Sequence, residues 1–234
     1  IISFKLAVKS IADRHGLHAT FMPKPLYNKA GSGMHINMSL FKDNKNAFYD
    51  ENDELGLSKI AYNFIAGIIE HAKAMACITN PLVNSYKRLV PGYEAPVYIA
   101  WSTQNRSPLI RIPAARKSGT RLELRNPDPS ANPYLVLAVC LAAGLDGIKR
   151  NLKPKAQVGS NIFDLSQEDL NSMQIESIPE SLYDAIQIMK QDELIKETLG
   201  VHAFSKYVTY KENEWDSYKN FITKWEIDNY LYKY

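Results

Sequence analysis

The sequence predicts an α+β fold in which short strands are grouped between two long apolar helices. One helix is expected from Ser58 to about residue 77, because Ser58 is a favourable N-cap and apolar residues follow at helical spacing. The second is expected to begin at Asn132, with Pro133 in the first turn, where proline costs no hydrogen bond. The strand-like runs between them are PVYIAW (96–101), PLIRIP (108–113) and TRLELR (120–125). Since the strands do not alternate with helices, α+β is favoured over a doubly wound parallel sheet.

Further elements are expected on either side of this centre. Residues 1–15 have helical spacing that ends at Gly16, and LHATFM (17–22) is typical of a strand. In MHINMSL (34–40) apolar and polar residues alternate, which predicts a strand with one apolar face. After a polar linker (153–161), we expect a helix opened by Ser181 and a helical tail over about 204–231.

Composition excludes several classes of protein. With 234 residues and 45% apolar content the chain can bury a substantial core, in one large or two modest domains. The net charge of +3 is too small for general attraction to nucleic acid or to an anionic membrane. No apolar run reaches about 18 residues and the N-terminus lacks the order of a signal peptide, so we expect a cytoplasmic protein.

Two features of the chain concern its cysteines and its first residue. Cys77 and Cys140 lie in Ala-rich, helix-like segments, which favours buried reduced thiols over a disulfide. The first residue is Ile rather than Met, which suggests that the start of a longer protein is missing.

Arginine is concentrated in one part of the sequence. Six of the eight arginines lie between positions 88 and 125, where only Glu94 and Glu123 are acidic. The six are Arg88, Arg106, Arg111, Arg116, Arg121 and Arg125. A planar guanidinium binds carboxylate or phosphate through two hydrogen bonds, so this clustering indicates recognition of an anion.

The strand at 120–125 has a charged face. Period-two alternation places Arg121, Glu123 and Arg125 together, opposite two leucines. Two interpretations stay open. Either these residues form cross-strand ion pairs on an exposed surface, or Glu123 holds a hard divalent cation while the arginines hold phosphate or carboxylate oxygens.

The strand at 34–40 offers a second candidate surface. His35, Asn37 and Ser39 share its polar face directly after a GSG turn, whose backbone can approach a ligand closely. A lone histidine is more often structural than a ligand. HExxH and paired-cysteine spacings are absent from the sequence, so a zinc site is not expected.

Glu94 lies in NSYKRLVPGYEAP (84–96), a loop restricted by Pro91 and Pro96. Its carboxylate could act as a base or cation clamp on a covering flap, and the alternative is an incidental surface turn. Taken together, Glu94, the arginines and the candidate metal ligands describe a site for a polyphosphate-bearing ligand and a divalent metal. Such a site has the parts that phosphoryl transfer requires, positioning and charge neutralisation.

Long ordered segments of the chain closely resemble the catalytic domain of bacterial type I glutamine synthetases, most densely over 19–150. They are FMPKP, GSGMH, NSYKRLVPGYEAP, NRSPLIRIP, RLELR and DPSANPYLVLAVCLAAGLDGIK. The resemblance implies that 1–234 is the C-terminal catalytic domain of a longer chain, with a mainly antiparallel curved sheet and flanking helices. It implies ATP-dependent ligation of ammonia to L-glutamate through γ-glutamyl phosphate, with Mg²⁺ or Mn²⁺.

The same resemblance implies roles for individual positions. His35 and Glu123 would be metal ligands. Glutamate would be bound by Gly31, Arg88, Glu94, Arg106 and Arg125. ATP would be bound by Asn37, Ser39, Arg106, Arg111 and Arg121. Glu94 and Arg106 would be catalytic, with Glu94 completing the ammonium site and accepting the proton on a mobile segment that it shares with Arg88.

Three departures from the family pattern qualify this assignment. Ala30 stands where the family usually has Asn, which removes or replaces one amide contact to glutamate. Phe163 aligns with the tyrosine that some members adenylylate, so regulation by that modification is not expected. The family's β-grasp domain and further acidic metal ligands precede the matched region, and its active sites form between subunits of a double-ringed dodecamer. We therefore expect residues 1–234 alone to be inactive.

Three other functions are alternatives to this one. A γ-glutamylation relative would use a larger amine, although the retained Glu94 favours ammonia. A nucleic-acid-binding module would use the arginines on phosphates, but Glu123 between two of them would repel a phosphate backbone. A non-catalytic relative would have no need to keep His35, Glu94, Glu123 and the arginines together.

Overall fold

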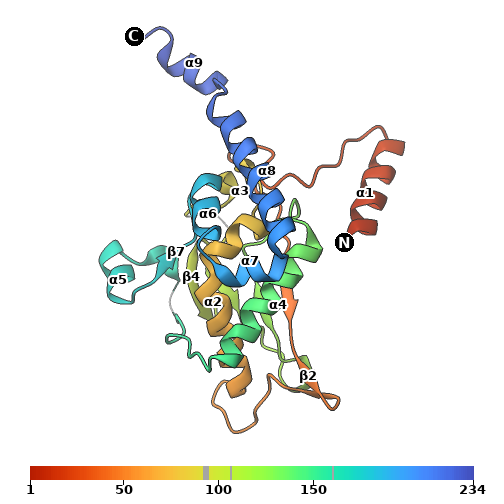
Figure 1. The fold of residues 1–234 in the computed structure, drawn as a ribbon, viewed down its shortest axis with the longest axis vertical. Helices are drawn as coiled ribbons and strands as arrows, with labels where there is room; N and C mark the ends of the chain where they lie inside the picture. The colour runs from red at the N-terminus through yellow and green to blue at the C-terminus, as the bar shows by residue number, and fades with distance from the viewer. Residues whose placement is uncertain (92–94, 106, 160) are drawn as a thin grey trace.

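The computed structural model describes residues 1–91, 95–105, 107–159 and 161–234, and these residues form a mixed α+β fold (Figure 1). The helices are α1 (Ile2–Arg14), α2 (Lys59–Thr79), α3 (Val83–Arg88), α4 (Pro133–Lys149), α5 (Gln167–Ser172), α6 (Leu182–Met189), α7 (Glu193–Leu199), α8 (Val201–Lys219) and α9 (Lys224–Tyr230). The strands are β1 (Ile36–Met38), β2 (Phe41–Lys42), β3 (Lys45–Asn46), β4 (Tyr98–Ser102), β5 (Pro108–Arg111), β6 (Leu122–Leu124) and β7 (Glu176–Ser177).

Five strands form the main sheet in the order β1-β6-β5-β4-β7. All neighbouring pairs are antiparallel except β4 and β5, which are parallel. The register places Glu123 of β6 opposite Asn37 of β1 on one side and opposite Arg111 of β5 on the other. The predicted α+β class with a mainly antiparallel sheet is therefore confirmed, and three charged or polar side chains are aligned across the sheet.

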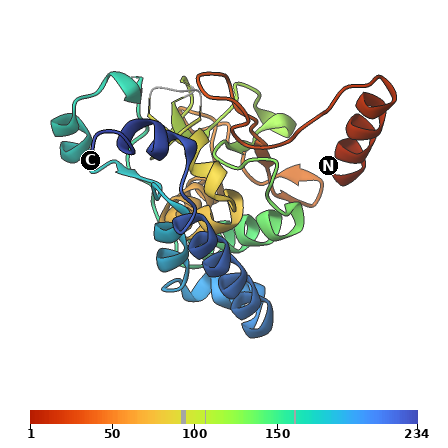
Figure 2. The same cartoon turned by 90° about the horizontal axis from the view of Figure 1, so that it is seen from above.

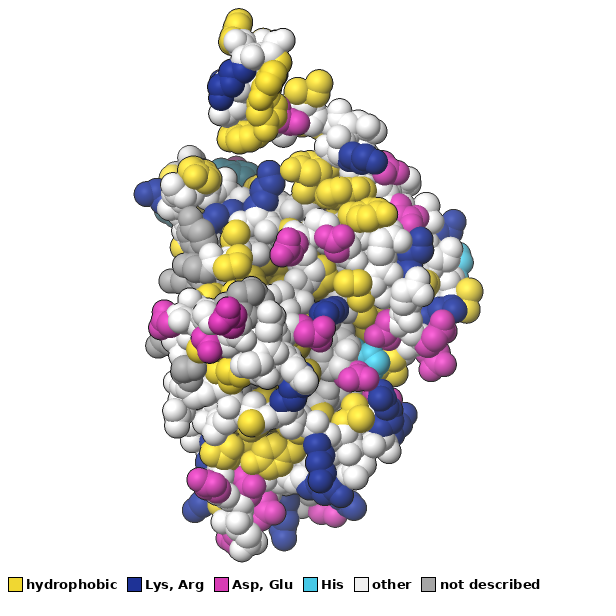
Figure 3. All heavy atoms as spheres, turned by 90° about the vertical axis from the view of Figure 1, so that its left-hand side faces the viewer, with side chains coloured by type: hydrophobic (Ala, Val, Ile, Leu, Met, Phe, Trp, Pro, Cys, Tyr) yellow, Lys and Arg dark blue, Asp and Glu magenta, His cyan; other side chains and the backbone are white. Residues whose placement is uncertain are grey.

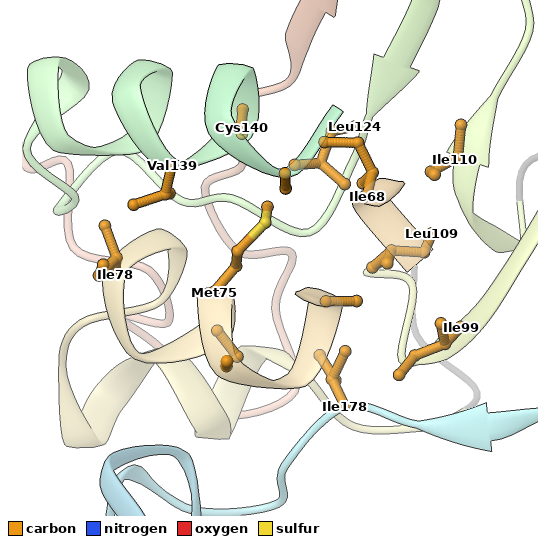
Figure 4. Close-up of a cluster of buried hydrophobic side chains, with 14 of the residues drawn as sticks. Ile68, Met75, Ile78, Ile99, Leu109, Ile110, Leu124, Val139, Cys140 and Ile178 are labelled. Carbon is orange, nitrogen blue, oxygen red and sulfur yellow. The ribbon is translucent and has the colours of Figure 1, made fainter. Parts of the chain in front are cut away.

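The two predicted apolar helices form the centre of the core. Helix α2 packs against α4, α6 and strand β4. Side chains of α2, α4 and the sheet point toward one another between these elements (Figure 4). Cys77 on α2 and Cys140 on α4 are free and fully buried, as expected. In the first turn of α2, Ala61 is buried while Ile60 is 39% exposed.

Glycines allow α2 and α4 to approach at backbone distance. A methyl group added at Gly67 would collide with the backbone of Ala143 and Gly147, and one added at Gly147 would collide with the backbone of Asn63. A methyl group at Gly144 would enter the ring of Phe64. The helix crossing therefore tolerates no side chain at these positions, because a close-packed core has no space to absorb it.

Side-chain caps fix where the main helices begin. Ser58 accepts a hydrogen bond from the backbone N–H of Ala61 (3.2 Å), and Asn132 accepts one from that of Tyr134 (3.0 Å). Ser181 caps α6 in the same way. Each bond satisfies a backbone donor that has no partner within its helix, and all three predicted helix starts are confirmed.

Some predicted elements are wrong or were missed. Residues 17–22 form no strand, because they lie in the extended connection between α1 and the body and pair with no described strand (Figure 1). Phe21 packs against Phe4 of α1 instead (ring centroids 6.2 Å apart). The predicted tail is two helices, α8 and α9, separated at 220–223. The hairpin β2–β3 was missed, although Asp43 and Asn44 take the positive φ angles (51° and 59°) that favour a two-residue turn.

The two ends of the chain project from the body. Helix α1 stands apart in two perpendicular views, joined by an extended segment, and α9 projects at the other end (Figures 1 and 2). None of the residues of α1, all of which the structure describes, is buried. Hydrophobic side chains also gather on the segment that projects at the top of the molecule, where Figure 1 places α9 (Figure 3). Across the described ranges, no helix combines the length and apolarity needed to span a bilayer.

A buried histidine joins three helices on the side of the core. Nδ1 of His71 on α2 lies 2.6 Å from Oδ2 of Asp192, and its Nε2 lies 3.2 Å from Oδ2 of Asp146. Asp146 belongs to α4, and Asp192 caps α7 by accepting from the backbone N–H of Ile195 (3.0 Å). Burial alone would lower the pKa of His71, but its hydrogen bonds to Asp192 and Asp146 outweigh burial and raise the pKa.

Replacing Gly67 by Ala should lower the free energy of unfolding by about 2 kcal/mol or more, because the methyl group forces α2 and α4 apart. Glycine-to-alanine changes in helices usually stabilise, so the sign of the effect is diagnostic. Urea unfolding measures it. Gly159→Ala is the control, because a methyl group there meets nothing within 4 Å. Equal effects of the two changes would show that the helices are not in backbone contact.

Replacing His71 by Gln should destabilise the protein more at about pH 6 than at about pH 9. Because folding raises the pKa of His71, its contacts with the two carboxylates stabilise the folded protein fully below pH 6.5, the ordinary pKa of histidine. This stabilisation is lost as the pH rises through the raised pKa. The pKa values of Asp146 and Asp192 are lowered, so both carboxylates stay ionised at the lower pH. Urea unfolding at both pH values checks this, with His202→Gln, an exposed histidine, as the control. A loss that does not depend on pH would show that folding does not raise the pKa of His71.

Candidate functional site

A cavity of about 670 Å³ lies beside the sheet and brings together residues from distant parts of the chain. The described residues that line it are Lys24, Asn28, Lys29, Ala30, Gly31, Gly33, His35, Arg88, Ala95, Asn105, Ser107, Arg125, Asn161 and Phe163. Among these described residues none is acidic, whereas four are lysine or arginine. The cavity therefore favours an anionic ligand.

The GSG turn forms part of the cavity wall. The N–H of Ser32 donates to the carbonyl of Pro23 and that of Met34 to the carbonyl of Pro127, both at 2.8 Å. A methyl group at Gly33 would lie 2.7 Å from Nη2 of Arg88. A side chain at position 33 would therefore displace the Arg88 guanidinium, which lies directly against the turn. The predicted close approach of this turn to a ligand site is consistent with its place in the cavity wall.

Arg88 is fixed by a helix rather than by the loop that was expected to carry it. It is the last residue of α3 and is 7% exposed. Its Nη1 donates to the carbonyl of Asn126 at 2.7 Å. Burial lowers the pKa of Arg88, the charge of Asp128 opposes this, and the nearby charge of Arg125 adds to the lowering. The expected loop position is therefore wrong for Arg88, while its sharing of a mobile segment with Glu94, which lies outside the described residues, stays a prediction.

Glu123 is the centre of a cluster of basic side chains. Its Oε2 accepts from Nε of Arg111 at 3.0 Å, and its Oε1 lies 2.8 Å from Nδ1 of His35 and 3.4 Å from Nε of Arg125. Burial would raise the pKa of Glu123, but the hydrogen bond and charge of Arg111, together with the charges of His35 and Arg125, outweigh it and lower the pKa. The carboxylate is 5% exposed and ionised. The cross-strand ion pair between Glu123 and Arg111 therefore exists, but Glu123 is buried and does not lie on an exposed surface.

His35 is neutral near pH 7 in this arrangement. Burial lowers its pKa, and the charges of Arg125 and Arg88 add to this while Glu123 opposes it. A neutral ring beside a carboxylate donates through Nδ1, which leaves the lone pair of Nε2 available on the cavity side. In this arrangement Nε2 is the ligand atom that the ring offers to a divalent cation, and Glu123 orients the ring through Nδ1, as carboxylates do for metal-binding histidines. Within the described ranges no third His, Cys, Asp or Glu joins them to complete a metal-binding group.

The residues assigned to ATP lie along the sheet beside this cluster. Asn37 and Arg111 flank Glu123 in the register, and Nε of Arg121 donates to Oδ1 of Asn37 at 3.0 Å. Ser39 is exposed just beyond the end of β1. These four residues form a polar surface that continues from the cavity rather than part of the cavity lining.

Two predicted catalytic residues, Glu94 and Arg106, lie outside the described residues, so their expected roles stay predictions. Their neighbours Ala95, Asn105 and Ser107 all line the cavity. Ala30, where the family usually has asparagine, also lines it. Phe163 also lines the cavity and packs against Tyr98 (ring centroids 6.0 Å apart).

Arg116, the remaining member of the arginine cluster, has a structural role. Its Nε donates to the carbonyl of Leu55 at 2.6 Å, and its Nη1 donates to the carbonyls of Pro113 and Ala115. It holds the loop before α2 against the sheet. Sequence clustering alone did not separate this arginine from those at the cavity.

Sequence analysis missed a buried polar network behind the cavity. Thr79, Asn80, Asn126 and Asp128 are each at most 2% exposed and hydrogen-bond to one another. The signal that could have found them is the pair of polar runs TN (79–80) and NPDPS (126–130), which flank apolar segments of the core. Buried polar groups are retained where each has a partner, so such runs predict a network.

The fold and the cavity define an α+β domain with a basic cavity, and comparisons with known proteins identify its family. The family model described as "Glutamine synthetase, catalytic domain" matches residues 1–230. A glutamine synthetase from Clostridium saccharobutylicum is 62% identical over 234 residues, covering 100% of this chain and 53% of that protein. One from Staphylococcus aureus (strain MW2) is 52% identical, covering 100% of this chain and 52% of that protein.

Solved structures agree with this assignment. "Apo GmaS without ligand" superposes with a TM-score of 0.86 at 41% identity, covering 97% of this chain and 51% of that chain. "GmaS/ADP complex-Conformation 1" gives 0.88 at 41% identity, covering 97% and 52%. The chain belongs to the glutamine synthetase catalytic-domain family. It spans about half the length of the relatives that it matches.

Replacing Glu123 by Gln should lower the free energy of unfolding by about 2 kcal/mol or more, because it leaves buried positive charge without its counter-ion. Chemical denaturation near neutral pH measures the effect. Glu176→Gln is the matched control, because Glu176 forms an ion pair with Lys73 at the surface, where pairs contribute little. If the two changes have the same small effect, Glu123 does not hold the cluster together.

Proposed function

We propose that the full-length protein joins ammonia to L-glutamate with the cleavage of ATP to ADP and phosphate. In the first step the γ-carboxylate of glutamate attacks the γ-phosphorus of ATP, which forms γ-glutamyl phosphate and releases ADP. Ammonia then attacks the acyl carbon, the C–O bond to phosphate breaks, and the nitrogen loses a proton as the amide forms. Family membership over the whole chain supports this reaction.

The observation that carries the proposal is the charge of the cavity. Arg88 and Arg125 line it together, they are each 7% exposed, and no acidic residue stands among the described lining. Two buried guanidinium groups suit a substrate with two carboxylates, since each can bind one through paired hydrogen bonds. Gly31 would contribute backbone contacts to the amino-acid part of glutamate.

The surface beside the cavity is proposed to hold the nucleotide and metal. Arg111 and Arg121, with Arg106, would neutralise charge on the transferred phosphoryl group, and Asn37 and Ser39 would contact the nucleotide. His35 and Glu123 would hold a divalent cation, Mg²⁺ or Mn²⁺. When bound, that cation would offset negative charge on phosphate oxygens, in the manner usual for metal ions at nucleotide sites. Glu94 would complete the ammonium site and accept the proton.

The rest of the proposal concerns the whole protein. Residues 1–234 would form its C-terminal catalytic domain, and the active sites would lie between neighbouring subunits of a cytoplasmic dodecamer of two hexameric rings. The fraction of each relative that this chain covers, about half, supports a requirement for further segments. Residues 1–234 alone would then form no glutamine.

The direct test is to measure glutamine formation by the full-length protein with glutamate, ATP and a divalent cation. Ammonium should be the preferred amine in competition with ethanolamine and polyamines. Preference for a larger amine would instead identify a γ-glutamylation enzyme. Strongly salt-dependent binding of DNA or RNA, without any ligase activity, would favour the nucleic-acid-binding alternative.

Replacing Glu94 by Ala in the full-length protein should lower the rate of glutamine synthesis by about 10²-fold or more, because a general base is removed. ATP affinity should change little, since the carboxylate is assigned to the amine and not to the nucleotide. Steady-state kinetics and ATP titration measure the two effects. An equal loss of ATP affinity would show that Glu94 has a structural role.

Replacing Arg125 by Lys should raise the KM for glutamate by about tenfold or more, because lysine cannot bind a carboxylate through a planar pair of donors. The KM for ATP should change much less. Arg150→Lys is the control, because Arg150 is half-exposed and pairs with Asp146 and Glu70 away from the cavity. Equal changes in both KM values would remove Arg125 from the glutamate site.

A further inference from the structure

We infer that Asn80 is a positioning residue for the anion cavity, which it does not itself line. Through the carbonyl of Asn126 it orients the guanidinium of Arg88, and through the same loop it fixes the GSG turn. The identity of the anion as glutamate rests on the proposed function, whereas the positioning role rests on the contacts that follow.

Asn80 is fully buried at the C-terminal end of α2, and both ends of its amide are occupied. Its Nδ2 donates to the carbonyl of Asn126 at 2.8 Å and to Oδ2 of Asp128 at 3.1 Å. Its Oδ1 accepts from Oγ1 of Thr79 at 2.9 Å and from Nδ2 of Asn126 at 2.8 Å. Aspartate has the same shape but no donor, so it could not make the first two bonds.

The Asn126 carbonyl is shared between Asn80 and the cavity. Nδ2 of Asn80 donates to this oxygen at 2.8 Å, and Nη1 of Arg88 donates to the same oxygen at 2.7 Å. A carbonyl that accepts two hydrogen bonds in a buried setting is held in direction as well as in place. The orientation of the Arg88 side chain therefore depends on an amide that is linked to it by two hydrogen bonds through one carbonyl.

The same loop fixes two further parts of the cavity. Arg125 directly precedes Asn126, and the carbonyl of Pro127 accepts from the N–H of Met34 at the end of the GSG turn (2.8 Å). Asp128, which Asn80 holds, carries the negative charge that acts favourably on Arg88. One amide thus sets the positions of both buried guanidinium groups and of the turn packed against Arg88.

The competing explanation is that Asn80 only closes the end of α2. Its backbone N–H does accomplish this, donating to the carbonyl of Ala76 at 2.8 Å. That bond needs no side chain, so helix closure does not explain an asparagine here. A purely structural role would alter folding stability without separating the kinetic constants of the two substrates.

The test uses Asn80→Asp in the full-length protein. The change removes both donors and places a carboxylate against Asp128, so the loop and Arg88 should shift. The KM for glutamate should rise about tenfold or more while the KM for ATP stays within about twofold. Thr79→Val, which removes one hydroxyl from the network at nearly constant shape, should give a smaller change in the same direction.

Asn63→Ala provides the matched control. Asn63 is also a buried asparagine of α2 whose Nδ2 donates to a backbone carbonyl, that of Leu152, but it lies outside the cavity lining. The Asn63→Ala protein should be less stable than the unaltered protein, but both of its KM values should be unchanged. If Asn63→Ala separates the two KM values as Asn80→Asp does, or if Asn80→Asp shifts both equally, the inference fails.

A crystal structure of the Asn80→Asp protein decides the question independently of the reaction. Displacement of Arg88 from the Asn126 carbonyl supports the inference, and retention of that contact overturns it. Absence of glutamine formation by the unaltered protein would refute the proposed function alone, because the crystallographic result would still stand. If Asn80→Asp does not fold, Thr79→Val carries both measurements.

Discussion

The close crossing of α2 and α4 is the constraint on which the rest of the structure depends. Gly67 and Gly147 bring the two backbones into contact, so the helices have little freedom to slide or rotate against each other. Helix α2 also packs on the sheet through β4. The end of α2 at Asn80 is consequently held at a fixed place relative to the strands. The polar network that begins at Asn80 can then hold the residues of the cavity wall in fixed positions.

The candidate site places several charges in a largely buried setting, and its contacts compensate their loss of hydration. Glu123 is surrounded by Arg111, Arg125 and His35, while Arg88 is held by a backbone carbonyl and by the charge of Asp128. Removing a charged group from water is costly unless partners replace its hydration. The arginines on the cavity side can then be presented to an anion with little rearrangement, which is the condition for effective electrostatic stabilisation.

Much of the fold could be predicted from local patterns. Ser58, Asn132 and Ser181 begin helices as expected, and the alternation in MHINMSL and RLELR gives strands β1 and β6. These features depend on neighbours in sequence, such as a cap or a side-chain period. The failures depend on distant partners. Residues 17–22 have a strand-like pattern but no strand to pair with, and Arg88 lies in a short helix that packs against α6 and α8.

The sequence by itself determined the α+β class, the core helices, and the identity of the charged residues, because periodicity and motif spacing record these directly. Only the tertiary structure decided which arginines act together. Arg88 and Arg125 reach the cavity, Arg111 and Arg121 lie along the sheet, and Arg116 holds a loop. It also revealed that Thr79, Asn80, Asn126 and Asp128 meet. Their contacts join residues nearly fifty positions apart. The sheet register and the helix crossing bring these residues together, and both depend on long-range contacts that no local sequence pattern predicts.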